Sequence, residues 1–297
     1  MEILEELVTV RDWMRYAVSR FNAAQLVYGH GTQTAIDEAA YLLLNSLNLP
    51  IDDINPWLDA RLLPAERRQI HDIIEQRIVS RKPAAYLTHE AWIGKNRFYV
   101  DERVIVPRSY IGELLTSGSL ASLLPDSERV RRVLDLCTGS GCLAILSALT
   151  FESAQVDASD LSGDALDVAK RNVSDYGLQE RIALARGDLF APWKGNQYDL
   201  IIANPPYVAD AARAAFPPEY AAEPALAHAG GTDGLDLVRR ILAGARDFMA
   251  PEGVLVVEVG RGRSILEEEF PRLAFVWLDT AESEGEVFAL GRSAWHA

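Results

Sequence analysis

The stretch V-R-R-V-L-D-L-C-T-G-S-G-C-L-A-I, residues 130–145, holds the pattern that decides the fold. Its first seven residues form a short apolar run typical of a buried strand, and Gly139 and Gly141 then interrupt the chain. The apolar segment that follows favours a helix. Glycine lets the backbone pass close to a ligand, and a helix that begins here presents free N–H groups to it. The stretch therefore predicts a strand, a ligand-binding turn and a helix, as at the start of an α/β sheet.

The same alternation continues toward the C-terminal end of the sequence. Helices are expected near 141–150, 162–176, 234–249 and 263–270. Strands are expected at seven apolar runs: 130–136, 154–160, 181–186, 198–203, 253–259, 274–279 and 286–290. This order predicts an α/β fold with a doubly wound, mostly parallel, seven-stranded sheet. Only T-A-E-S-E-G separates the last two runs, which is too short for a parallel crossover, so these two strands should pair antiparallel.

The N-terminal part, residues 1–88, predicts a small all-helical domain. Helical apolar spacing covers 2–24, and a second helix is expected over 34–47, where Thr34 and Asp37 resemble a capping pair. A third helix starts at a proline, Pro64, a residue suited to the first helical turn.

Residues 89–108 are rich in aromatic and β-branched side chains on either side of a Gly-Lys-Asn turn. This pattern predicts a β-hairpin. We therefore expect a helical domain over 1–88, a hairpin linker over 89–108 and the α/β domain over 109–297.

The composition is that of a globular protein of 297 residues with a net charge of −14 and a pI of about 4.8. An acidic surface repels phosphates, so direct nucleic-acid recognition is not expected, whereas a basic protein partner is favoured. The same charge also fits simple solubility. Neither a signal peptide nor a membrane span is expected, because the N-terminus lacks the required pattern and no apolar run approaches roughly 20 residues. Two cysteines in one loop suggest no disulfide framework, which fits a cytoplasmic location.

Two acids lie where a cofactor that contains adenosine would need them. Asp160 ends the second strand, 21 positions after Gly139, as a ribose-binding acid does. Asp188, in R-G-D-L-F (186–190), ends the third strand and can accept from an adenine amine. Asp135 ends the first strand, where it could reach a cationic amino-acid group but would repel a diphosphate. The last point counts against a dinucleotide.

The fourth strand, Y-D-L-I-I-A, ends in N-P-P-Y, residues 204–207. Neither proline can continue a central sheet ladder, so the segment is a stiff extended stub whose carbonyls are not used in a turn. If Asn204 Oδ1 and the Pro205 carbonyl both accept from an amide NH₂, that nitrogen is held in line with a methyl donor. Tyr207 would form an aromatic wall against the planar group. The plainer interpretation is a strand terminator.

Together these stretches resemble the class I (Rossmann-like) S-adenosylmethionine-dependent methyltransferases, whose N-P-P-Y subgroup methylates planar nitrogens. The whole chain resembles the HemK-like protein-glutamine N5-methyltransferases. Members that act on release factors typically carry P-R-P-D-T-E after the hairpin, where this chain has V-P-R-S-Y-I-G-E-L, residues 106–114. That difference, with V-S-R-F-N-A-A (18–24), Y-G-H-G-T (28–32), A-Y-L-T (85–88) and F-Y-V-D-E-R-V (98–104), resembles the branch that methylates large-subunit ribosomal protein L-three.

The resemblance implies S-adenosylmethionine as cofactor, S-adenosylhomocysteine as product, and a helical domain that recognises the substrate. No metal site is expected, because the histidines show no paired spacing with Cys or Asp. The implied cofactor residues are Asp135, Thr138, Gly139, Gly141, Asp160, Asp188, Leu189 and Asn204. The implied catalytic residues are Asn204, Pro205, Pro206 and Tyr207. Leu189 departs from relatives that have tryptophan there, so either Phe190 stacks on adenine or Leu189 simply packs. The segments 219–227 and 230–235 resemble one that closes over the site, and they suit either a moving lid or an ordinary connection.

The predicted function is methyl transfer to the side-chain amide nitrogen (N5) of a glutamine in ribosomal protein L-three. Release-factor methylation is an alternative with the same chemistry. Adenine N6-methylation of nucleic acid shares N-P-P-Y but needs a basic groove. An NAD-dependent oxidoreductase would leave N-P-P-Y unexplained, and a non-catalytic binding module could be excluded only by activity. The sequence leaves open the target glutamine, the oligomeric state and whether the substrate is free protein or an assembly intermediate.

Overall fold

The computed structural model describes residues 2–124, 126–281 and 283–296. By its internal contacts the chain forms two compact units. The first, here called the helical unit, comprises Met1–Ala91 together with Phe216–Ala222. The second, here called the sheet unit, comprises Trp92–Ala215 and Glu223–Ala297. The short segment 216–222 therefore belongs to the helical unit, although both of its neighbours in the sequence belong to the sheet unit.

The helical unit has an apolar core formed by Trp13, Phe21, Leu42, Ile70 and other buried side chains. Its helices are α1 (Glu2–Glu6), α2 (Val10–Ala23), α3 (Ala35–Ser46), α4 (Pro64–Ser80) and α5 (Ala84–Thr88), with a 3₁₀ turn at Asn55–Trp57. The start of α4 at a proline and the capping of α3 confirm the predictions, since the Thr34 side chain accepts from the Asp37 amide.

The expected single helix over 2–24 is wrong, because the chain breaks between α1 and α2. Thr9 is extended and caps α2: its hydroxyl accepts from the Asp12 amide, and the Asp12 carboxylate accepts from the Thr9 amide. This reciprocal capping box satisfies N–H groups that a new helix start would otherwise leave free. Local hydrogen bonding thus ends a run whose apolar spacing would allow one helix.

The predicted hairpin forms over a shorter range than expected. Strands β1 (Glu90–Ile93) and β2 (Asn96–Tyr99) make a two-stranded sheet around the Gly94 turn. Residues 100–106 are not a strand, which corrects the longer expectation, and instead lead to Pro107.

The sheet unit contains a seven-stranded sheet with the order β5-β4-β3-β6-β7-β9-β8. Its strands are β3 (Arg132–Leu136), β4 (Gln155–Asp160), β5 (Ile182–Arg186), β6 (Tyr198–Ala203), β7 (Met249–Glu258), β8 (Val276–Leu278) and β9 (Val287–Gly291). Neighbours among β3 to β7 pair parallel, whereas β9 pairs antiparallel with both β7 and β8. The predicted doubly wound sheet and its antiparallel last pair are confirmed.

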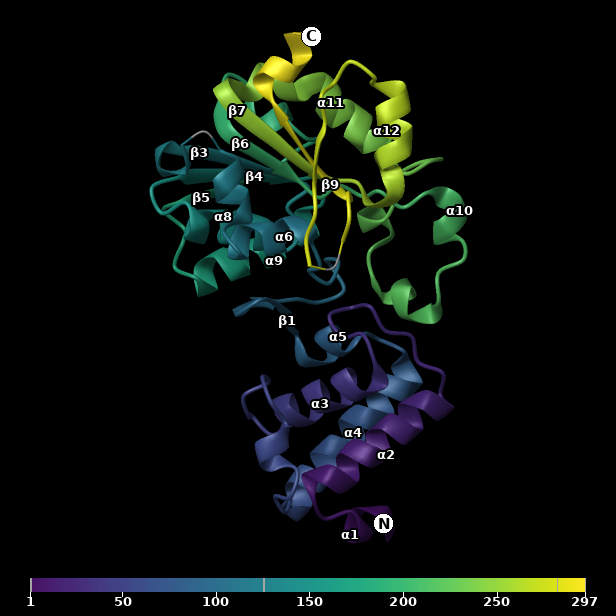
Figure 1. The fold of residues 1–297 in the computed structure, drawn as a ribbon. Coiled ribbons are helices and arrows are strands. Elements are labelled where there is room, and N and C mark those ends of the chain that lie inside the picture. The colour runs from purple at the N-terminus through teal and green to yellow at the C-terminus, as the bar shows by residue number, and fades with distance from the viewer. Residues whose placement is uncertain (1, 125, 282, 297) are drawn as a thin grey trace. The chain divides into compact units, whose positions relative to one another are not determined.

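Helices cover both faces of this sheet (Figure 1). Along β6, Leu200 and Ile202 join one buried cluster with α6 and α8, whereas Ile201 and Ala203 join the other with α11 and α12. Successive strand side chains point to opposite faces, so one apolar run fills both layers. The helices of this unit are α6 (Tyr110–Thr116), α7 (Ser119–Leu123), α8 (Cys142–Thr150), α9 (Gly163–Asp175), α10 (Asp210–Arg213), α11 (Asp236–Phe248) and α12 (Arg263–Glu269).

The strand order reverses between β3 and β6. In open α/β sheets, ligands bind beyond the carboxyl ends of the strands at this position. The glycine turn follows β3 and N-P-P-Y follows β6, so the fold places both sequence motifs at the same edge of the sheet. In the described part of the chain, no helix has both the length and the apolar character that crossing a membrane requires.

Candidate active site

The turn between β3 and α8 leaves room for a ligand at one glycine and for protein packing at the other. Gly139 has φ +54°, and a Cβ built there would meet no atom within 4 Å. Gly141 has φ +80°, and its Cβ would lie 3.1 Å from the Ala169 Cβ in α9. The first glycine thus keeps the turn open to solvent or ligand, and the second lets two helices approach. The two glycines thus serve different purposes in the turn.

Asp135 lies fully buried at the end of β3. The Thr138 hydroxyl donates to Asp135 Oδ2 at 2.5 Å, whereas Oδ1 has no hydrogen-bond partner among the residues that the structure describes. Burial raises the pKa of Asp135 to about 7, although the hydrogen bond from Thr138 opposes that shift. A buried carboxylate oxygen without a donor suits a cationic or hydrogen-bonding ligand group, and the role of Asp135 in cofactor binding stays a prediction.

Asp160 braces the glycine turn from the end of β4. Its Oδ2 accepts from the Gly139 amide at 2.9 Å and its Oδ1 accepts from the Ser162 amide at 2.8 Å. Burial raises its pKa, and these backbone hydrogen bonds oppose the rise. Each carboxylate oxygen can accept more than one hydrogen bond, so the group can hold the turn and still receive ribose hydroxyls.

Asp188 and Leu189 follow β5. Asp188 Oδ2 forms an ion pair with Arg240 Nη2 at 2.6 Å, and both side chains are about half exposed. Leu189 has φ +49°, lines the cavity and also packs in a buried cluster. Phe190 instead stacks on Phe248 in the core, with ring centroids 4.6 Å apart. Leu189 therefore lines the cavity, whereas Phe190 does not.

Asn204 directly follows β6, and a neighbouring backbone carbonyl determines which way its side-chain amide points. Asn204 Nδ2 faces the backbone carbonyl of Arg108 at 3.5 Å, and a carbonyl can only accept. The oxygen of the same amide, Oδ1, has no hydrogen bond in the described part of the chain. Neither does the Pro205 carbonyl. Two acceptors of the stub are thus left for a ligand with two N–H groups.

Tyr207 does not form the aromatic wall that the sequence suggested. Its hydroxyl donates to Glu258 Oε1 at 2.8 Å, and a Cβ at Gly260 would lie only 2.9 Å from its ring. Glu258, itself buried at the end of β7, also accepts from the Ser109 hydroxyl at 2.7 Å. Tyr207 therefore anchors the stub to β7 because its ring and hydroxyl are already used there.

The segment after the stub is held by a second buried glutamate. Glu223 binds Arg108 through two contacts of 2.7 Å and accepts from the Val106 amide at 3.0 Å. His228 Nε2 lies 2.9 Å from Glu223 Oε2. Because the Arg108 carbonyl faces Asn204, this ion pair fixes the backbone that orients the acceptor amide. Sequence reasoning missed Arg108, Glu223 and Glu258. A signal existed only for Glu258, as an acid that ends a buried apolar run.

Glycines let the returning chain lie directly on the stub. A Cβ at Gly234, with φ +89°, would lie 2.3 Å from the Tyr207 carbonyl oxygen, and one at Gly230 would lie 2.8 Å from the Tyr207 carbonyl carbon. Val208 donates to the His228 carbonyl and accepts from the Gly230 amide. The glycines of the G-G-T-D-G motif thus allow the backbone of the returning chain to pack against the backbone at Tyr207.

These elements surround a cavity of about 320 Å³, a size typical of small-molecule sites. Of the predicted residues, six line it: Gly139, Asp160, Asp188, Leu189, Asn204 and Pro206. The other five do not line it: Asp135, Thr138, Gly141, Pro205 and Tyr207. Arg103 and Arg240 also line it without having been predicted, and Pro224, Leu226 and Ala227 line it from the segment 219–227 that was expected to close over the site. Within 2–124, 126–281 and 283–296, no group of three His, Cys, Asp or Glu side chains could hold a metal ion.

Comparison with solved structures supports the fold. The catalytic domain of hMettl16, solved in complex with a MAT2A 3′UTR hairpin, is 16% identical to this chain. The match has a TM-score of 0.51 and covers 80% of this chain and 84% of that one. At this identity the likeness concerns the fold alone.

The sequence relatives are far closer, and residues 115–216 match the family model described as methyltransferase small domain. A protein of Bordetella pertussis, named ribosomal protein uL3 glutamine methyltransferase, is 57% identical over 97% of this chain and 96% of its own length. Proteins of the same name from Bradyrhizobium diazoefficiens and Neisseria gonorrhoeae are 55% and 54% identical, over 90% and 96% of their lengths. Identity at this level over nearly full length confirms the resemblance. The chain belongs to the ribosomal protein uL3 glutamine methyltransferase family.

Proposed function

We propose that this methyltransferase transfers a methyl group to the side-chain amide nitrogen of a glutamine in ribosomal protein uL3. S-adenosylmethionine is the methyl donor, as the sequence predicted. The single observation that carries the proposal is the Asn204 amide, whose Nδ2 faces the Arg108 carbonyl at 3.5 Å. That contact leaves Oδ1 as an acceptor beside the Pro205 carbonyl, and a carboxamide NH₂ offers two N–H groups to such a pair.

The residues present fit the donor. The open turn at Gly139 accommodates a ligand, the Asp160 carboxylate suits ribose hydroxyls, and the partnerless Asp135 oxygen suits an ammonium group. Leu189 offers an apolar surface to adenine beside Asp188. When bound, S-adenosylmethionine supplies an electrophilic methyl group on a positively charged sulfur.

The acceptor chemistry follows from the properties of an amide. Its nitrogen is a poor nucleophile because its lone pair is delocalised into the carbonyl. Hydrogen bonds from both N–H groups to Asn204 and Pro205 would hold that nitrogen in place and increase its electron density. No general base is needed before attack, since the nitrogen becomes acidic only after methylation. The two prolines keep the acceptors rigid, so little conformational entropy is lost when the substrate binds.

Charge supports a ribosomal substrate. The protein carries a net charge of −14, and complementary charge speeds the encounter with a basic protein and favours it over acidic competitors. The cytoplasmic location and the lack of direct nucleic-acid recognition stay predictions. So does the role of the helical unit in substrate recognition.

Labelled S-adenosylmethionine tests the assignment. The enzyme is incubated with ribosomal proteins and assembly intermediates from a strain that lacks it, and the labelled residue is identified by mass spectrometry. We expect label on one glutamine of uL3. Label on a release factor would support glutamine methylation but refute uL3 as the substrate, whereas label in RNA or DNA would refute amide methylation.

A further inference from the structure

The acceptor-site loop, here defined as residues 208–231, does not belong to one unit throughout. Its first and last parts belong to the sheet unit, and its middle, Phe216–Ala222, belongs to the helical unit. The middle part contains a 3₁₀ turn, Pro218–Ala222. The chain that leaves the stub at Tyr207 therefore becomes part of the helical unit before it returns to line the cavity at Pro224 and Leu226.

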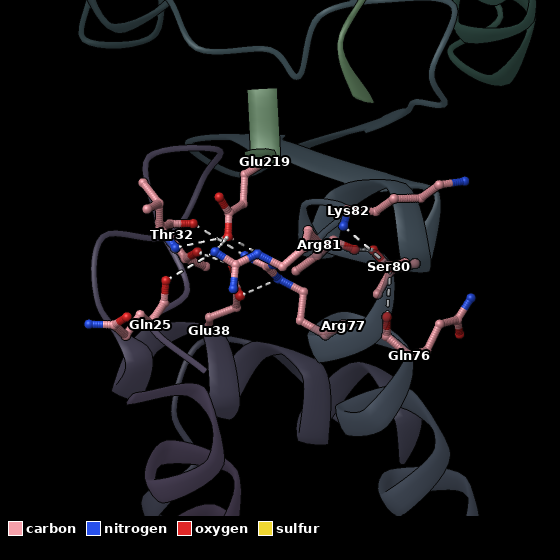
Figure 2. A network of polar contacts seen from close by, with 12 residues as sticks. Gln25, Thr32, Glu38, Gln76, Arg77, Ser80, Arg81, Lys82 and Glu219 are labelled. Atoms are coloured by element: carbon pink, nitrogen blue, oxygen red, sulfur yellow. Dashed lines mark hydrogen bonds and ion pairs between the residues drawn. The ribbon is translucent and has the colours of Figure 1, made fainter. Parts of the chain in front are cut away.

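The middle of the loop is held by a buried charge cluster (Figure 2). The Glu219 side chain is 0% exposed, and its Oε1 accepts from the Val27 amide at 3.1 Å and pairs with Arg81 Nη2 at 2.9 Å. Arg77, 1% exposed, lies 3.9 Å from the same oxygen and pairs with Glu38 Oε1 at 2.7 Å. Glutamate is almost never fully buried without such partners.

The charges in this cluster balance only when the loop is present. Residues 1–91 contribute two arginines, Arg77 and Arg81, but one buried acid, Glu38. Glu219 contributes the second negative charge. Since an uncompensated charge is costly to bury, the fully buried Glu219 requires the arginines, whereas loss of Glu219 would leave Arg77 paired with Glu38 and would remove an ion pair from Arg81, which is 26% exposed.

A second contact holds the same segment independently of charge. The Tyr220 ring lies 4.3 Å, centroid to centroid, from the His30 ring and 4.5 Å from the Phe216 ring. A Cβ at Gly29, with φ +115°, would lie 3.5 Å from the Tyr220 hydroxyl. The Y-G-H-G-T motif at 28–32 thus packs against Tyr220 in the middle of the loop, although the proposed catalytic chemistry does not use this motif.

We propose that Glu219 is a positioning residue through which the helical unit holds the acceptor-site loop in its catalytic conformation. Four residues later, Glu223 holds Arg108, whose carbonyl orients Asn204. The two glutamates therefore hold the loop at two points, one in each unit, and three residues separate them in the chain. This inference rests on the proposed function.

Two variants that remove one buried acid from the same cluster test it. Glu219→Gln removes the acid that lies on the loop, and Glu38→Gln removes the one that does not. Methyl transfer to uL3 is measured together with hydrogen–deuterium exchange of peptides spanning 208–231 and with thermal unfolding. We expect Glu219→Gln to lower kcat/KM roughly tenfold to a hundredfold and to speed exchange in the loop, because small misplacement of an acceptor is costly. Glu38→Gln should lower the melting temperature comparably and keep kcat/KM and loop exchange near wild type.

Equal loss of kcat/KM in both variants at matched stability would overturn the proposal, as would wild-type exchange and kinetics in Glu219→Gln. If Glu219→Gln does not fold, Arg81→Gln carries the same test, because Arg81 contacts Glu219 from α4's C-terminal end and is 26% exposed. The proposal fails if Arg81→Gln keeps wild-type kcat/KM and exchange. Wild-type enzyme without activity on uL3 would instead refute the proposed substrate, so the two failures are distinct.

Discussion

Asn204 Nδ2 lies 3.5 Å from the backbone carbonyl oxygen of Arg108, and this contact determines which atom of the Asn204 amide is presented to the cavity. Arg108 is in turn held by Glu223, a buried glutamate of the acceptor-site loop. The orientation of the Asn204 amide thus depends on an ion pair whose two residues do not line the cavity.

Glu223→Gln should weaken that support. Neutralising the acid replaces hydrogen bonds between charged groups by weaker ones, so we expect the free energy of unfolding to fall by about 2–3 kcal/mol. The kcat for methyl transfer should fall roughly tenfold or more, because the Arg108 backbone no longer fixes the Asn204 amide. The same exchange at the exposed Glu268 is the control and should leave both quantities unchanged. Unaltered kcat in a destabilised Glu223→Gln enzyme would show that the ion pair is structural only.

Gly234→Ala should damage the site through the backbone. The added Cβ would lie 2.3 Å from the Tyr207 carbonyl oxygen, so the stub or the loop must move. Gly195→Ala is a matched control, since Gly195 has φ +87° and open space around its Cβ position. Both variants pay about 1 kcal/mol of left-handed strain, but only Gly234→Ala should lose most of its methyl transfer. Urea unfolding and initial rates separate the two, and equal activity would contradict the close approach of the two backbones.

Tyr207→Phe should affect stability more than chemistry. Burial raises the pKa of Tyr207, so its hydroxyl stays protonated and donates to Glu258. Its removal leaves a buried carboxylate short of one donor, which should cost about 1–3 kcal/mol of unfolding free energy. Because the ring and hydroxyl are used away from the cavity, kcat should change less than about tenfold, measured at a temperature where both proteins are folded. A fall in kcat by several orders of magnitude would instead show that Tyr207 is a catalytic residue.

Asp135 should make stability depend on pH. Burial raises its pKa from 3.8 to about 7 in the folded protein. Between these values the folded state binds the proton that the unfolded state has lost, so stability falls as pH rises and the penalty is complete above about pH 7. The full penalty is at most about 4 kcal/mol. Asp135→Asn lacks this carboxyl group, so its unfolding free energy relative to wild type should increase from pH 5 to pH 8. Denaturant titrations of both proteins measure this difference, and a value independent of pH would contradict the assignment.

The sequence was most informative where local pattern determines structure. The seven apolar runs, the turn at Gly139 and the stub at 204–207 depend on neighbours within a few residues, and the strands, the mostly parallel sheet and its antiparallel last pair were predicted correctly. The capping box also has a sequence signal, a threonine at position 9 followed by an aspartate three residues later. The helical apolar spacing continues across it, however, so the break between the two helices was missed.

Long-range partners were not predictable in the same way. Nothing near Tyr207 in the sequence indicates that its hydroxyl meets Glu258, fifty-one positions later. The burial of Glu223, which depends on Arg108, and the inclusion of 216–222 in the helical unit are likewise set by tertiary contacts. Such residues look like ordinary surface acids until the fold brings their partners to them.

Single-turnover methyl transfer by Asn204→Ala tests the central claim most directly. The rate is measured on uL3 at saturating S-adenosylmethionine, with circular dichroism to verify folding and the exposed Asn22→Ala as control. Loss of one preorganised hydrogen-bond partner should lower the rate by roughly 10²–10³-fold, while Asn22→Ala keeps the wild-type rate. A folded Asn204→Ala enzyme that methylates uL3 within threefold of the wild-type rate would contradict the claim that this amide holds the substrate nitrogen.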